Sequence, residues 1–132
     1  ALALHQPQPA DPLQVLRCLG GFEIAGLAGL VLGAAAERMA VVLDGFIASV
    51  AALCAVRIAP EASGYLLPSH RSAEAGHRIV LRELGALPLF DFEMRLGEGS
   101  GAALAMTVLD AAVKLLLEMA TFETAGVTDA GR

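Results

Sequence analysis

Apolar residues recur along the chain in two patterns, which predict alternating helices and short strands. The expected helices have an apolar side or are apolar almost all round, and they cover residues 12–19, 22–38, 47–58, 74–84 and 102–119. The expected strands are short aliphatic or aromatic runs, and they cover residues 41–43, 65–67 and 88–90. Because strands and helices alternate, we expect an α/β fold with a partial doubly wound, Rossmann-like parallel sheet and buried helices rich in Ala and Gly.

The same pattern divides the chain into three segments. Residues 1–10 have two prolines and no apolar period, so they are expected to be a tail or linker, and residues 120–132 are expected to be a C-terminal tail. Residues 11–119 form the expected α/β segment. The apolar helix at 22–38 has no polar face and should be covered on most sides. A chain of 132 residues provides little such cover, so we expect an incomplete domain or a subunit of a tight oligomer.

Composition excludes several classes of protein. The chain is 56% hydrophobic and 17% charged, against about 25% charged in average domains, which excludes an intrinsically disordered chain. A net charge of −5 is the wrong sign for a nucleic-acid binder. The longest apolar runs, residues 24–36 and 45–56, fall short of the roughly 20 residues of a membrane span. We therefore expect no membrane contact, with a membrane hairpin as the less favoured alternative.

The cysteines and histidines indicate no metal site. Cys18 and Cys54 lie in apolar runs, where buried free thiols are expected. His70 and His77 are seven residues apart, and no further ligand completes a metal set at helical spacing. The N-terminus has no basic stretch followed by an apolar core, so we expect a cytoplasmic location.

One glutamate is flanked by glycines. Glu98 lies in the segment Gly97–Gly101, whose glycines free the backbone and let a ligand approach closely. A carboxylate presented in this way can act as a general base, particularly beside apolar side chains. An acidic residue that stabilises the start of the following helix is the alternative, and the spacing does not separate the two.

Two further polar segments lie at the expected ends of strands. Asp44 and Gly45 follow the strand at 41–43, so Asp44 should face a crevice at the carboxyl edge of the sheet or cap the next helix. The cluster Ser69–Ser72 offers hydroxyls and a guanidinium to a phosphate or ribose. Capping by Ser72 and Glu74 is the alternative function of that cluster. The chain has no dinucleotide-binding, Walker or nucleophile-elbow pattern.

Four segments together carry a family resemblance. They are Leu19–Ala25 (LGGFEIA), Val42–Ile47 (VLDGFI), Ser69–His77 (SHRSAEAGH) and Met94–Ala102 (MRLGEGSGA). Their order and spacing resemble the C-terminal part of the nicotinate-nucleotide–dimethylbenzimidazole phosphoribosyltransferase family. The resemblance implies transfer of phosphoribose from nicotinate mononucleotide to 5,6-dimethylbenzimidazole with inversion at the anomeric carbon. The products would be nicotinate and α-ribazole 5′-phosphate, used in assembly of the cobalamin nucleotide loop.

The resemblance also implies roles for individual residues. Glu98 corresponds to the catalytic general base. The substrate-binding positions would be Asp44, Gly45, Ser72, Leu96 and Gly97. No cofactor and no metal are implied, and a homodimer is expected when the protein is complete. The chain departs from the family at Ala75, where proline is common, and in having no counterpart of an upstream glycine-rich segment. The alternative function is a truncated, non-catalytic relative that binds benzimidazole or nucleotide without turnover.

Overall fold

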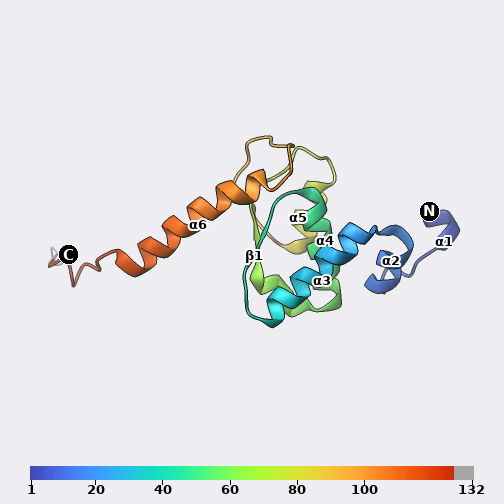
Figure 1. Cartoon of the computed structure of the whole chain (residues 1–132), viewed down its shortest axis with the longest axis horizontal. Helices are drawn as coiled ribbons and strands as arrows, with labels where there is room; N and C mark the ends of the chain where they lie inside the picture. Colours follow the sequence, from blue (N-terminus) through green and yellow to red (C-terminus); the bar gives the residue numbers. More distant parts are fainter. Residues whose placement is uncertain (127–132) are drawn as a thin grey trace, which may run out of the picture.

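Two short parallel strands form the sheet of this computed structural model, which describes residues 1–126 (Figure 1). Strand β1 (Val41–Leu43) pairs with strand β2 (Leu66–Pro68), with Leu43 opposite Pro68. Helix α4 (Phe46–Ile58) and the 3-10 helix η1 (Pro60–Tyr65) connect the two strands. Such a crossover is what parallel neighbours require, because their like ends lie at the same edge.

The other helices surround this unit or extend away from it. They are α1 (Leu2–His5), α2 (Pro12–Leu19), α3 (Phe22–Ala36), α5 (His77–Leu84) and α6 (Ser100–Glu118). The helix ends follow local chemistry: Asp11 caps α2 by accepting the Gln14 N–H, and Gly85 ends α5 with a φ of 62°. Figure 1 shows α6 running away from the body of the protein, on the side opposite to α1 and α2.

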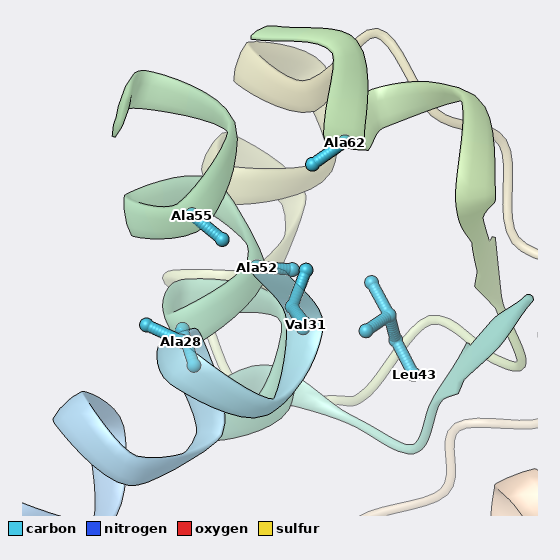
Figure 2. Close-up of a cluster of buried hydrophobic side chains, with 7 residues drawn as sticks. Ala28, Val31, Leu43, Ala52, Ala55 and Ala62 are labelled. Carbon is cyan, nitrogen blue, oxygen red and sulfur yellow. The ribbon is translucent and has the colours of Figure 1, made fainter. Parts of the chain in front are cut away.

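The apolar core is small and built largely of alanine. Its members come from α3, β1, α4 and η1, and they are Ala28, Val31, Leu43, Ala51, Ala52, Ala55 and Ala62. Figure 2 shows Val31 of α3 and Leu43 of β1 directed into the same space beside Ala52 of α4. Because alanine side chains are short, the backbones of α3 and α4 can approach closely and hold β1 against them.

Several expected elements differ from the structure. The strand expected at residues 88–90 reduces to a single parallel bridge between Phe90 and His70, so the described sheet has two strands. Residues 1–10, expected to lack structure, contain the one-turn helix α1. Helix α5 begins at His77, because residues before it are used in a polar turn. The expected tail begins near the end of α6, but residues 127–132 lie outside the described part of the chain.

The expectation that the apolar helix at 22–38 is covered on most sides is wrong for this chain. In α3 only Ala28 and Val31 are buried, whereas Phe22 is 99% exposed. The two cysteines, expected to be buried, are each half-buried free thiols. A bare apolar side on α3 shows that the described residues do not supply all the cover that the helix sequence requires.

Helix α6 is the second large apolar surface. Its exposed side chains include Leu116 and Leu117, and its 19 residues are long and apolar enough to cross a membrane by length and composition. The same properties occur in helices that pack against protein. Only 11% of its most apolar stretch is buried within the described chain.

Candidate functional site

A cavity opens at the carboxyl ends of the two strands, where ligands bind in open α/β folds. It has a volume of about 560 Å³. Five residues singled out in the sequence line it: Asp44, Gly45, Ser72, Gly97 and Glu98. They come from three segments far apart in the chain, which the pairing of β1 with β2 and the start of α6 bring together.

The remaining lining is mixed in character. Phe46, Ile47 and Ala48 from the first turn of α4 form an apolar wall, and His70, Glu74 and Arg95 add polar groups. Leu96, expected at the site, lies outside this lining, and its side chain is 72% exposed. The cavity therefore offers an apolar surface for a flat ring beside groups able to donate, accept or carry charge.

The Asp44 carboxylate holds the start of α6. Its Oδ1 accepts the backbone N–H groups of Gly101 at 2.8 Å and Ala102 at 3.1 Å, and its Oδ2 accepts that of Gly99 at 3.1 Å. A negative charge is favourable at this helix end, where backbone N–H groups lack partners within the helix. Asp44 therefore lines the cavity as expected, but the expected cap of the next helix is wrong, because α4 has no side-chain cap and the carboxylate holds the start of α6 instead.

The loop before α6 has an unusual backbone. Gly97, Glu98 and Gly99 have φ angles of 74°, 56° and 78°, so three successive residues adopt the left-handed conformation. Glycine takes this conformation without strain, but glutamate does so at a cost of about 1 kcal/mol. Gln6, Arg38 and Glu93 also have positive φ angles, so the feature that distinguishes Glu98 is its place in the lining of the cavity. Here the left-handed turn leaves Glu98 exposed while it lines the cavity.

Ser72 makes the expected capping hydrogen bond and also lines the cavity. Its backbone N–H donates to Nδ1 of His77 at 2.8 Å, and its Oγ accepts the Glu74 N–H at 3.3 Å. Ser72 also lines the cavity. It is therefore both a turn-capping residue and a cavity residue.

The Arg71 side chain does not line the cavity at the strand ends. Its guanidinium forms an ion pair with Asp91, with Nη2 to Oδ2 at 2.6 Å, and it lines a neighbouring cavity. The hydroxyl and guanidinium groups of Ser69–Ser72, expected to act together, therefore face different surroundings. Sequence order alone does not give the direction in which each side chain points.

Both histidines of the segment are buried and hydrogen-bonded. His77 accepts at Nδ1 and has Nε2 2.9 Å from Oγ of Ser49, so its ring spans α4 and the polar turn. Burial, with a smaller contribution from His70, lowers the pKa of His77 below its ordinary value of 6.5. No group of three His, Cys, Asp or Glu residues in the described chain is placed to hold a metal ion.

Gly101 permits close packing at the base of the cavity. A Cβ atom at this position would overlap the His70 ring and lie 2.9 Å from Oγ of Ser69. The first turn of α6 therefore lies directly on the residues that follow β2. A small residue ahead of a long apolar helix was visible in the sequence, but the neighbour that requires it was not.

A two-stranded parallel pair with a crossover helix and a cavity at its strand ends is the arrangement in which open α/β proteins bind their ligands. A family model described as "Phosphoribosyltransferase" matches residues 1–127. The chain belongs to this phosphoribosyltransferase family.

Curated relatives and a solved structure support this assignment. The chain is 57% identical over 131 residues to the nicotinate-nucleotide–dimethylbenzimidazole phosphoribosyltransferase of Syntrophobacter fumaroxidans, covering 99% of this chain and 37% of that protein. It is 58% identical over 128 residues to the protein of the same name in Roseiflexus sp. RS-1, and the match covers 97% of this chain and 36% of that protein. The crystal structure of that enzyme from Thermus thermophilus superposes with a TM-score of 0.89 at 43% identity, covering 97% of this chain and 39% of the other. The chain thus spans a little over a third of the length of these relatives.

Proposed function

We propose that the chain takes part in transferring phosphoribose from nicotinate mononucleotide to 5,6-dimethylbenzimidazole, with Glu98 as the general base. The relatives bear the name of this reaction. The observation that carries the role of Glu98 is the left-handed turn that presents its carboxylate along the cavity shared with Asp44, Gly45 and Ser72.

The chemistry of the transfer needs one proton acceptor. One ring nitrogen of dimethylbenzimidazole uses its lone pair to form the bond to the anomeric carbon, and the other ring nitrogen loses its proton to the Glu98 carboxylate. The bond from the anomeric carbon to the pyridinium nitrogen breaks, and its electron pair neutralises the ring of the departing nicotinate. The anomeric carbon passes through an oxocarbenium-like state, as in glycoside chemistry. No metal is required for these steps.

The remaining lining suits the other parts of the substrates. Gly45 is the N-cap residue of α4 and offers no side-chain cap, so the first N–H groups of the helix are available to a phosphate. The apolar first turn of α4 offers a surface to the dimethyl ring. Asp44 keeps the Glu98 turn in place by holding the N–H groups that follow it.

The proposed setting is a cytoplasmic homodimer without membrane contact. The exposed apolar side chains of α3 and α6 support an assembled state, because contiguous exposed apolar surface on soluble proteins often marks an interface.

Replacing Glu98 with Gln tests the role of the carboxylate. Gln keeps the size and the hydrogen-bonding reach but cannot accept a proton. In the longest chain that the gene encodes, we expect the rate of nicotinate release to fall about 100-fold or more, as for loss of a general base. Binding of dimethylbenzimidazole, measured by calorimetry, should change little.

Glu93→Gln is the matched control. Glu93 is also exposed and also has a positive φ, of 53°, but it lines the neighbouring cavity. We expect turnover close to wild type in this variant. Near wild-type turnover in Glu98→Gln would remove Glu98 from the role of base. Dimethylbenzimidazole binding without nicotinate release by the wild type would instead support the non-catalytic alternative.

A further inference from the structure

We propose that His70 is a fixed hydrogen-bond acceptor that recognises a ribose hydroxyl of the nucleotide substrate. The proposal rests on the proposed function and adds a residue that determines specificity for the sugar. His70 is 2% exposed and lines the cavity. Its role follows from the hydrogen bonds that fix which of its ring nitrogens carries the proton.

The hydroxyl of Ser69 fixes the proton on Nδ1 of His70. Oγ of Ser69 lies 2.7 Å from the Asp44 carbonyl oxygen, which can only accept, so the single hydroxyl hydrogen points to that carbonyl. Oγ also lies 3.0 Å from Nδ1 of His70. Because its hydrogen is already used, the hydroxyl must accept there, and Nδ1 of His70 must donate.

The other ring nitrogen is then an acceptor. A neutral imidazole has one N–H, so Nε2 of His70 carries a lone pair. Within residues 1–126, Nε2 has no hydrogen-bond partner, and no fully buried side-chain N or O atom lacks one. Nε2 therefore reaches the open space of the cavity. A Cβ at Gly45 would lie 3.6 Å from Nε2, so the missing side chain at Gly45 leaves room for a ligand there.

The lone pair on Nε2 of His70 can bind only those groups of the two substrates that donate a hydrogen bond. Phosphate and carboxylate groups present only lone pairs at neutral pH, so Nε2 does not bind them. The ring N–H of dimethylbenzimidazole is the proton that Glu98 takes in the proposed reaction. The hydroxyls of the ribose are the donors that remain. They suit the position next to Gly45, because a phosphate at the start of α4 places the attached sugar beside it.

Two substitutions separate this role from a packing role. His70→Asn keeps an N–H donor near the position of Nδ1, for Ser69, and removes Nε2. His70→Gln introduces a side chain that extends further and can place an oxygen acceptor near the position of Nε2. Both variants are to be compared with wild type in thermal unfolding, so that a loss of folding is recognised.

The measurement is calorimetric binding of nicotinate mononucleotide and of its 2′-deoxy and 3′-deoxy analogues, at pH 8, where imidazoles are ordinarily neutral. For His70→Asn we expect affinity for nicotinate mononucleotide to fall about tenfold, the effect of one hydrogen bond. Affinity for one deoxy analogue should equal that of wild type, because the deleted partner is already missing. His70→Gln should recover part of the loss.

Three outcomes overturn the proposal. Equal losses for all three ligands in a folded His70→Asn protein would make His70 a packing residue. Unchanged binding of nicotinate mononucleotide would remove its role altogether. If the wild type binds none of the three, the proposed function fails and this proposal falls with it. Binding without turnover in the wild type would contradict only the proposed reaction.

Discussion

Asp44 joins two parts of the chain that lie more than 50 residues apart. Its carboxylate accepts three backbone N–H groups at the start of α6, and its carbonyl oxygen accepts the Ser69 hydroxyl. Hydrogen bonds to a charged acceptor are about twice as strong as those between neutral groups. The residue thereby fixes the distance between the strand ends and the Glu98 turn, on which the geometry of the cavity depends.

Asp44→Asn should weaken this connection. The amide retains one acceptor oxygen, but its NH₂ group would face a backbone N–H and repel it. We expect a loss of about 2 kcal/mol in the free energy of unfolding, measured with urea, together with a lower rate of nicotinate release.

Asp11→Asn is the control for charge removal at a helix start. Asp11 caps α2 through a single exposed hydrogen bond, and Asn is as good an N-cap as Asp, so little stability should be lost. Equal destabilisation by the two variants would contradict the special position of Asp44.

The free energy of unfolding should depend on pH through the protonation of His77. Burial lowers its pKa in the folded protein below 6.5, and its Nδ1 accepts the Ser72 N–H, so a proton there would break that bond. The unfolded chain then binds more protons below about pH 6.5. The free energy of unfolding should therefore be fully present above that pH and fall as the pH drops toward the lowered pKa.

His77→Asn supplies the comparison for this pH dependence. Asn can still accept the Ser72 N–H but does not titrate in this range. The free energy of unfolding, measured with urea at several pH values between 5 and 8, should change less with pH for the variant than for wild type. Identical slopes would show that His77 does not carry the dependence.

The start of α6 brings the Glu98 turn against the residues that follow β2. Gly101 lies against the His70 ring, and an added methyl group would overlap it. Gly101→Ala should push α6 away from the strand ends and displace the Glu98 turn. We expect a loss of about 1–3 kcal/mol in unfolding free energy, as for overpacking, and reduced turnover.

Gly26→Ala is the control for this substitution. Gly26 lies inside α3 with no described atom within 4 Å of an added Cβ. Because alanine favours the helix, this change should stabilise the chain by up to about 1 kcal/mol. Greater stability of Gly101→Ala would contradict the close packing inferred at α6.

Local signals predicted most elements. β1 was expected at its observed residues because a β-branched run ends at Asp44, and α2 was expected because Asp11 and Pro12 mark its start. The strand expected at 88–90 forms only one bridge, because its pairing partner is the short continuation of β2 at His70. A strand pattern does not indicate how long its partner is.

The sequence predicted which residues share the cavity, but not how their side chains are paired. Asp44, Gly45 and Ser72 follow strand ends, and parallel strands bring such ends together, so their shared cavity could be expected from the sequence. The capping of α6 by Asp44 and the pairing of Arg71 with Asp91 could not, because both depend on contacts between distant segments. The fixed proton on His70 likewise follows only from three-dimensional hydrogen bonds.

The described chain leaves much apolar surface uncovered. The exposed side chains on α3 and α6 include Phe22 at 99%, Leu116 at 83% and Leu117 at 77%. The chain carries a net charge of −5, which opposes association only weakly at physiological salt. Apolar burial between chains should outweigh that repulsion.

We expect the 132-residue chain alone to self-associate. Sedimentation velocity should show species larger than a monomer, and the double substitution Leu116→Lys with Leu117→Lys should shift them toward the monomer. Arg82→Lys, at an exposed position on α5, provides a control that leaves the apolar surface of α6 intact. A monodisperse wild-type monomer would contradict this expectation.

The proposed reaction requires the Glu98 carboxylate to lie beside the dimethylbenzimidazole ring. The most direct test is a crystal structure of the longest chain that the gene encodes, with dimethylbenzimidazole bound. We predict that the ring lies against the first turn of α4, with a ring nitrogen about 2.6–3.2 Å from a carboxylate oxygen of Glu98. A ring bound outside this cavity, or a Glu98 carboxylate directed into solvent while the ring is in place, would contradict the role of Glu98 as the base.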